Sequence, residues 1–134
     1  MKKNICIVVA NYYPKISKSL IDGASKILKK NGIKNYKLIK VPGVFEIPYV
    51  IKKNINKYDA FLALGCVIKG ETPHFDFISM TSINAIMNLS VTFNKPIANG
   101  IITSLNKKQA LARSSKNNNK GKESAKAVIS LLKI

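Results

Sequence analysis

Two continuous apolar runs, Ile5–Ala10 and Ala60–Val67, restrict the fold of this chain more than any other feature. Each run has the length of a strand, and a strand without polar alternation is typical of a parallel sheet that helices cover on both faces. Between them, apolar residues recur at helical spacing from Ile16 to Leu28, and Gly32 follows as a stop signal. Because parallel strands need such crossover helices, the sequence predicts an α/β fold.

The rest of the chain continues the same alternation of strands and helices. We expect further strands at Tyr36–Val41 and Pro96–Ile102, further helices at Glu46–Asn54, Phe75–Leu89, Lys107–Arg113 and Lys122–Leu132, and a polar loop at Ser114–Lys120. No repeat or linker divides the 134 residues. The prediction is therefore one domain, 1–134, with a three-layer α/β/α, flavodoxin-like fold: a four-stranded parallel sheet flanked by helices.

Composition argues against several classes of partner. No apolar run reaches the roughly 18 residues of a membrane span, so we expect no membrane partner. The net charge is +17, but the lysines are scattered and lack interleaved aromatic residues, so we expect no nucleic-acid partner. A general attraction for anionic substrates remains open.

The two cysteines, Cys6 and Cys66, both fall in apolar strand contexts. We expect them to be buried free thiols, which suit a reducing cytoplasm. Their spacing is not that of a metal site, and His74 is the only histidine in the chain. We therefore expect neither a metal nor a cofactor.

Four loops follow the predicted strands, and in a parallel sheet such loops meet at one edge, where ligands bind. They contain Asn11–Pro14, Val41–Glu46, Gly65–Asp76 and Thr103–Ser104. Aromatic side chains, a carboxylate and an imidazole are suited to a flat heterocycle. Free backbone N–H groups at a helix start near Gly70, Glu71 and Thr72 are suited to binding a phosphate. Arg113 and Lys120 could add positive charge to that site.

Three blocks of residues together resemble the lumazine synthase family of riboflavin biosynthesis. They are Val41–Pro48, then Ala63–Asp76 including Lys69-Gly70-Glu71-Thr72-Pro73-His74, then Asn119-Lys120-Gly121 with Glu123 and Ala125. The resemblance runs from about Ile5 to the end of the sequence. It implies a transferase-class, metal-independent enzyme that condenses 5-amino-6-(D-ribitylamino)uracil with 3,4-dihydroxy-2-butanone 4-phosphate. The products would be 6,7-dimethyl-8-ribityllumazine, phosphate and water, in the penultimate step of riboflavin synthesis.

The resemblance also implies a role for each matching residue. His74 would be the catalytic proton carrier. Binding of the pyrimidine and its ribityl chain would fall to Tyr12, Val44, Phe45, Glu46, Val67, Ile68, Ala98, Asn99 and Lys120. Binding of phosphate would fall to Gly70, Glu71, Thr72 and Arg113. Because the family's sites lie between subunits, Ala98, Asn99, Arg113 and Lys120 would come from a neighbouring copy.

Two residues depart from the usual family pattern. Glu71 stands where a small residue is common, and its carboxylate would repel phosphate unless it points away or pairs with Lys69. Asn99 stands where Phe is frequent, which predicts looser or more polar packing from the neighbouring subunit.

Taken singly, the site residues also have purely structural interpretations. His74 can be a helix-capping residue, Tyr12 and Phe45 core aromatics, and Glu46 a carboxylate that the helix dipole favours. Two other functions also fit parts of the chain: a flavodoxin-like module that binds a flavin or pyrimidine without turnover, and a basic protein associated with nucleic acid.

For assembly, the resemblance implies a homo-oligomer built on a five-fold ring. We expect a homopentamer rather than a 60-subunit shell, which stays open as the alternative. The first strand begins almost at the start of the sequence, without the extension that often joins a neighbour's sheet. Repulsion among subunits of charge +17 also grows with assembly size.

Overall fold

The computed structural model describes residues 2–134 and has a parallel four-stranded sheet at its centre. The strands lie in the order β2 (Lys37–Val41), β1 (Ile5–Ala10), β3 (Ala60–Ile68) and β4 (Ile97–Ser104). Strand β3 pairs with β1 and β4: Ile5 lies opposite Ala60, and Phe61 lies opposite Ile97. Every residue of β1 is buried, which explains why that strand is apolar throughout.

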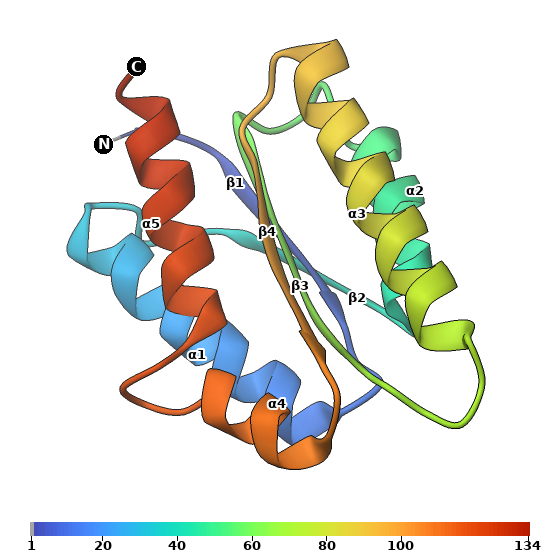
Figure 1. Ribbon diagram of the computed structural model, residues 1–134. Helices are drawn as coiled ribbons and strands as arrows, with labels where there is room; N and C mark the ends of the chain where they lie inside the picture. The colour runs from blue at the N-terminus through green and yellow to red at the C-terminus, as the bar shows by residue number, and fades with distance from the viewer. Residues whose placement is uncertain (1) are drawn as a thin grey trace.

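Helices cover both faces of this sheet, as Figure 1 shows. One face carries α1 (Pro14–Lys30) and α5 (Lys120–Leu132), and the other carries α2 (Ile47–Lys53) and α3 (His74–Phe93). The short helix α4 (Lys107–Arg113) follows β4, and a 3₁₀ turn, η1 (Val44–Glu46), precedes α2. The predicted three-layer α/β/α arrangement is confirmed.

Strand alternation divides the core into two parts, because successive side chains point to opposite faces. Along β1, Ile5, Ile7 and Val9 pack with α1 and α5. The intervening Cys6, Val8 and Ala10 pack with residues of α2 and α3. No helix among residues 2–134 is both long enough and apolar enough to cross a membrane.

Element boundaries follow the predicted stop signals, with one clear difference. Helix α1 begins at Pro14, a favoured first position, and is followed by Gly32 with φ 83°. Helix α3 continues four residues past the predicted end at Leu89 and ends at Asn94, which has left-handed φ 52°. Asparagine tolerates this conformation better than other residues with a side chain, so it replaces the expected glycine signal.

Asn119 fixes the loop between α4 and α5 against α1. Its side chain accepts a hydrogen bond from the Lys122 backbone N–H at 3.1 Å and so caps α5. Its Nδ2 donates to the carbonyl oxygens of Ser19 at 3.1 Å and Ser114 at 3.3 Å. Arg113 directly precedes Ser114, and Lys120 directly follows Asn119. The buried hydrogen bond between Asn119 and Ser114 therefore fixes the backbone beside both cations.

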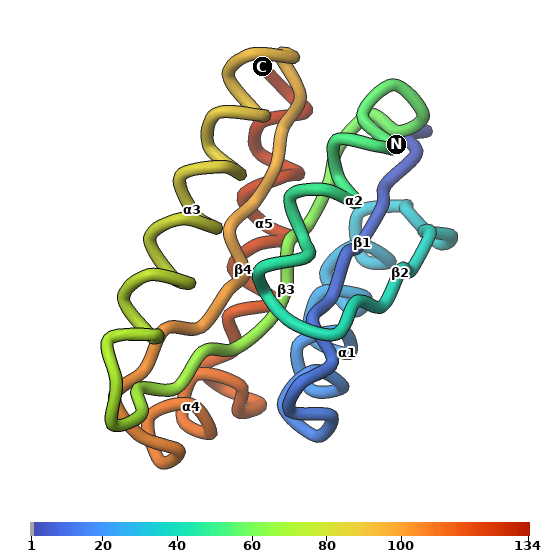
Figure 2. Tube along the Cα trace, turned by 90° about the vertical axis from the view of Figure 1, so that its right-hand side faces the viewer, coloured from blue at the N-terminus to red at the C-terminus, as the bar shows by residue number. Residues whose placement is uncertain are grey.

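The beginnings of α1 and α3 and the whole of α4 lie at the lower end of the molecule in both Figure 1 and Figure 2. The parallel strands also run toward this end, so their carboxyl ends meet there. This is the edge at which parallel α/β sheets bind ligands.

Candidate active site at the carboxyl ends of the strands

A cavity of about 480 Å³ opens at this edge of the sheet. The segments after β1 and β2, the end of β3 and the start of α3 all contribute to its walls. The lining residues are Tyr12, Tyr13, Pro42, Gly43, Val44, Phe45, Glu46, Cys66, Val67, Ile68, His74 and Ile78. Seven residues predicted as site residues are therefore brought together: Tyr12, Val44, Phe45, Glu46, Val67, Ile68 and His74.

Two aromatic side chains at the cavity are unusually exposed. Tyr12 is 71% exposed and Phe45 is 58% exposed, so neither is an ordinary core aromatic. Val67 and Ile68 are half-buried, and Val44 is buried. Open aromatic faces beside an apolar wall suit a flat heterocycle.

Gly65 allows the segment η1 to lie close to the end of β3. A Cβ atom at residue 65 would lie 2.9 Å from Cγ2 of Val44 and 3.1 Å from Cβ of Ala10. Any side chain here would push Val44 outward, and with it the neighbouring Phe45 and Glu46. The absence of a side chain at Gly65 thus helps to shape the cavity wall.

His74 is the first residue of α3 and its side chain is exposed at the cavity. Its backbone N–H donates to Oγ1 of Thr72 at 3.4 Å, so the threonine hydroxyl, and not the imidazole, meets a free amide of the helix start. Glu46 is half-buried at the end of η1, beside Gly43. An imidazole and a carboxylate therefore face the same apolar space.

The residues predicted to bind phosphate do not line this cavity. Gly70, Glu71 and Thr72 form an exposed loop before α3, and a Cβ at Gly70 would meet open space. Arg113 is exposed at the end of α4, and Lys120 is half-buried at the start of α5. No lysine or arginine is among the cavity-lining residues within the described chain.

The remaining two predicted residues lie on β4, also away from the cavity. Ala98 is buried in the core between the sheet and the pair α1 and α5. Asn99 is exposed, and its Oδ1 accepts a hydrogen bond from the Ile101 N–H at 3.0 Å.

Sequence reasoning missed five cavity residues: Tyr13, Pro42, Gly43, Cys66 and Ile78. Signals existed for most of them. Tyr13, Pro42 and Gly43 belong to loops that were predicted to be functional, and Ile78 follows His74 by one helical turn. Cys66 belongs to the predicted functional segment Gly65–Asp76, but its apolar strand context favoured a place in the core.

A model of the 6,7-dimethyl-8-ribityllumazine synthase family matches residues 2–134. The chain belongs to the lumazine synthase family. A family member from Buchnera aphidicola is 42% identical, over 99% of this chain and 87% of its own length. Members from Bartonella bacilliformis and Limosilactobacillus reuteri are 42% and 39% identical, over 96% and 97% of this chain and 88% of each relative. All three relatives bear the name 6,7-dimethyl-8-ribityllumazine synthase.

Both cysteines are free and buried, as predicted, and neither has the environment of a reactive thiol. Burial raises the pKa of Cys66 to about 11. Burial also raises the pKa of Cys6 to about 11, although the charge of Lys37 acts in the opposite direction. The thiolate fraction at neutral pH is then on the order of 10⁻⁴, so Cys66 contributes a neutral, apolar group to the cavity of this lumazine synthase family member.

We expect the folded protein to resist alkylation by iodoacetamide at pH 7.5. Protein unfolded in guanidinium chloride should react at both of its cysteines, because burial and the raised pKa disappear together. Mass spectrometry of the two samples measures the difference, and a Cys6→Ser variant assigns any single label. Rapid labelling of Cys66 in the folded state would show that the cavity floor opens to reagent.

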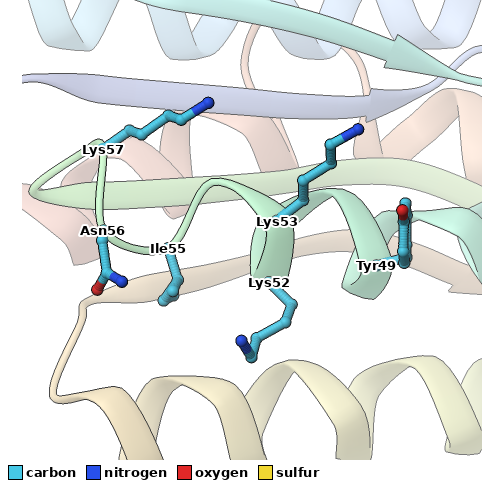
Figure 3. Close-up of a pocket in the computed structure, with 6 residues that line it drawn as sticks. All are labelled: Tyr49, Lys52, Lys53, Ile55, Asn56 and Lys57. Carbon is cyan, nitrogen blue, oxygen red and sulfur yellow. The ribbon is translucent and has the colours of Figure 1, made fainter.

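A second hollow, also of about 480 Å³, lies around the carboxyl end of α2 and contains Lys52, Lys53 and Lys57 (Figure 3). Two of these lysines have structural explanations. Lys52 and Lys53 occupy the last turn of α2, where positive charge offsets the carbonyl end of the helix. The ammonium of Lys52 also lies 5.0 Å from the ring centroid of Phe93. Among residues 2–134, no group of three or more His, Cys, Asp or Glu side chains is placed to hold a metal ion.

Proposed function

We propose that this protein is a 6,7-dimethyl-8-ribityllumazine synthase. It condenses 5-amino-6-(D-ribitylamino)uracil with 3,4-dihydroxy-2-butanone 4-phosphate and releases phosphate and water. The observation that carries this proposal is the cavity, in which the aromatic, carboxylate and imidazole groups expected of the family converge. Family membership over residues 2–134 supports the same reaction. The buried free thiols suit a cytoplasmic enzyme.

The pyrimidine binds in the cavity with its ring against Tyr12. The exposed faces of Tyr12 and Phe45 support this placement, because aromatic rings gain most by stacking on a flat partner. The backbone of η1 and the Glu46 carboxylate hold the polar ring edge and the ribityl hydroxyls, while Val67 and Ile68 form the apolar wall. These contacts hold the substrate amine in place for reaction.

The chemistry needs little beyond alignment and proton transfer. The substrate amine is the nucleophile and the substrate ketone is the electrophile, so carbon–nitrogen bond formation requires no nucleophile from the enzyme. Holding the two substrates together replaces much of the entropic barrier. His74, at the cavity edge, transfers protons as water and phosphate leave, since an imidazole gives and accepts protons near neutral pH.

A direct assay tests the proposal: purified protein is mixed with both substrates, and lumazine formation is followed by absorbance. We expect product to form, and to form at the same rate after exhaustive dialysis against a chelator. Absence of product with correctly folded protein would leave a binding module without turnover as the better interpretation. Activity lost with chelator and regained with a divalent ion would contradict the metal-independent mechanism.

His74→Ala should slow turnover while leaving affinity for the ribitylaminouracil nearly unchanged. Proton-transfer groups typically contribute about 10²- to 10⁴-fold, and we expect the low end because alignment supplies most of the rate. Steady-state kcat and calorimetric binding separate the two effects. A matched Thr92→Ala variant, at an exposed position near the other end of α3, controls for changes in the helix itself. Unchanged kcat across neutral pH would remove His74 from the mechanism.

The phosphate lies outside the cavity of a single subunit. Gly70 and Thr72 offer backbone and hydroxyl groups beside it, but the lining of the cavity lacks a cation. We propose that Arg113 and Lys120 of a neighbouring copy supply this charge, and that Ala98 and Asn99 reach the same site by the same route. The exposure of Arg113 is consistent with this arrangement. Glu71 is exposed, which leaves its carboxylate free to point away from the phosphate.

Helix α3 offers a surface for the neighbouring copies. Its outer face exposes Phe77, Met80, Met87 and Val91, each between 62% and 70% exposed. Spacings of three, seven and four residues place them on one stripe of the helix. An apolar stripe of this length on a small domain is typical of an interface between subunits. We propose that it lies within a homopentameric ring.

A further inference from the structure

Tyr13 lines the cavity beside Tyr12, yet the chemistry assigns it no role. Its ring is half-buried and packs against the part of the core that lies beneath α1 and α5. The ring centroids of Tyr12 and Tyr13 are 4.9 Å apart, and the ring planes meet at 72°. Tyr13 therefore presents a second aromatic surface between the core and the exposed ring of Tyr12.

The backbone of Tyr13 is held firmly. Its carbonyl oxygen accepts a hydrogen bond from the Ser17 N–H at 2.9 Å. The Ser17 hydroxyl lies 3.0 Å from the same oxygen and 2.7 Å from the carbonyl oxygen of Ala10. Ser17 is itself only 2% exposed. The Ser17 hydroxyl thus joins the end of β1 to the first turn of α1. The backbone of Tyr13 is held by these hydrogen bonds, and its ring packs on the core.

Tyr12 has the opposite environment. It is 71% exposed, and within the described chain its one aromatic contact is the edge-to-face contact with Tyr13. An exposed side chain exchanges readily between rotamers, so little else restrains this ring. A ring that must stack on a substrate binds more tightly when its orientation is already set.

We propose that Tyr13 is a positioning residue that holds the ring of Tyr12 in the orientation in which it stacks on a flat heterocyclic substrate. The identity of that heterocycle, the ribitylaminouracil, rests on the proposed function. The contact between the two tyrosines does not depend on that function.

The aromatic ring of Tyr13, and not its charge, performs this role. Burial raises the pKa of the Tyr13 phenol, and the neighbouring Cys66 and Tyr12 raise it further. The side chain is therefore neutral at neutral pH. Phenylalanine, which keeps the ring, should replace it, whereas leucine, which keeps apolar packing without a ring, should not.

Steady-state kinetics of Tyr13→Leu and Tyr13→Phe test the proposal. We expect Tyr13→Leu to raise KM for the ribitylaminouracil about three- to tenfold, the range that one edge-to-face aromatic contact supports. The kcat and the KM for the butanone phosphate should stay unchanged, because Tyr13 contributes only to pyrimidine binding. Tyr13→Phe should remain within about twofold of the natural protein. A fall in kcat with both KM values altered would overturn the proposal.

A double-mutant cycle shows whether Tyr13 acts through Tyr12. In a Tyr12→Leu background, adding Tyr13→Leu should change KM by less than about twofold, because the ring that Tyr13 positions is already gone. Equal effects in both backgrounds would mean that Tyr13 contacts the substrate or stabilises the fold independently of Tyr12.

A measurement without substrate keeps this inference separate from the proposed function. The chain has 5 tyrosines, so the ring signals of ¹³C-labelled tyrosine can be assigned by substitution. We expect Tyr13→Leu, but not Tyr13→Phe, to increase rotamer averaging of the Tyr12 ring. An unchanged Tyr12 signal would overturn the positioning role. Failure of the natural protein to form lumazine would overturn only the proposed function.

Discussion

Gly121→Ala should destabilise the fold by about 3 kcal/mol or more, the upper range for overpacking a close contact. Gly121 lies in the first turn of α5, where that helix meets α1. An added Cβ would overlap the backbone carbonyl oxygen of Leu20, and would lie 2.8 Å from its carbonyl carbon and 2.9 Å from Oδ1 of Asn119. A backbone carbonyl in the middle of α1 cannot move aside as a flexible side chain would. Alanine can be accommodated only if the two helices separate.

Helix propensity acts in the opposite direction at this position. Alanine is favoured over glycine by about 1 kcal/mol in a helix, so the overlap must exceed that gain for the variant to be destabilised. Ala127→Gly, at an exposed position of the same helix, measures the propensity term alone and should cost about 1 kcal/mol. Gly70→Ala, where a Cβ would meet open space, should change stability by less than about 0.5 kcal/mol.

Urea unfolding of the three variants and the natural protein, at equal protein concentration, gives the comparison. Concentration is held fixed because assembly contributes to apparent stability. A Gly121→Ala protein as stable as the natural one would mean that α1 and α5 can separate at little cost. It would also mean that Asn119 and its neighbours do not fix the position of Arg113 and Lys120.

The fold was predictable because its signals are local. Apolar runs marked the strands, and helical spacing from Ile16 to Leu28 followed by Gly32 marked α1. The end of α3 was predicted too early because the residues beyond Leu89 are mostly polar or β-branched, and because Asn94, a less common stop signal than glycine, ends the helix. The segment before α2 is a separate 3₁₀ turn. A sequence of three residues does not distinguish a 3₁₀ turn from the first turn of an α-helix.

The candidate site was predictable where strand topology alone brings residues together. Tyr12, Phe45, Val67 and His74 meet because parallel strands all end at the same edge. Tyr13 was missed because, within the predicted functional loop Asn11–Pro14, the resemblance gave a role to Tyr12 alone. In the turn between β1 and α1, both tyrosine rings line the cavity instead.

The structure of one chain does not bring the predicted phosphate-binding cations to the cavity. Arg113 and Lys120 belong to the α4–α5 region, and neither lines the cavity of their own subunit. Their charge connected them with phosphate, but only the resemblance to a family with shared sites placed them in a neighbouring copy. The proposal that a neighbouring copy supplies them therefore makes a prediction about mixed assemblies.

Mixing two inactive variants should restore about a quarter of the natural activity. One variant carries Arg113→Ala with Lys120→Ala and lacks the cations. The other carries Phe45→Ala with Glu46→Ala and lacks the pyrimidine contacts. In randomly mixed rings, about one site in four has intact cavity residues from one subunit and intact cations from the next. If every site were built within one subunit, no mixture would contain an intact site.

The losses in the separate variants must be large for this recovery to be visible. Hydrogen bonds to charged groups contribute about 1.5–3 kcal/mol each, so removing both cations should reduce kcat/KM for the butanone phosphate by at least about 10²-fold. Arg113→Lys keeps the charge but loses the planar two-pronged geometry, and should raise KM for the phosphate substrate much more than KM for the pyrimidine. Equal effects on the two substrates would place Arg113 outside the phosphate site.

Three controls test whether recovered activity comes from mixed rings. Light scattering should give a mass near five chains for each variant and for the mixture, because none of the changes touches the stripe Phe77, Met80, Met87 and Val91. Subunits must be mixed under conditions that exchange them, and unexchanged mixtures should stay inactive. Met87→Glu in both variants places a charge in the proposed interface, so it should lower the mass and abolish the recovery together. Full activity of a monomer would contradict both the ring and the shared site.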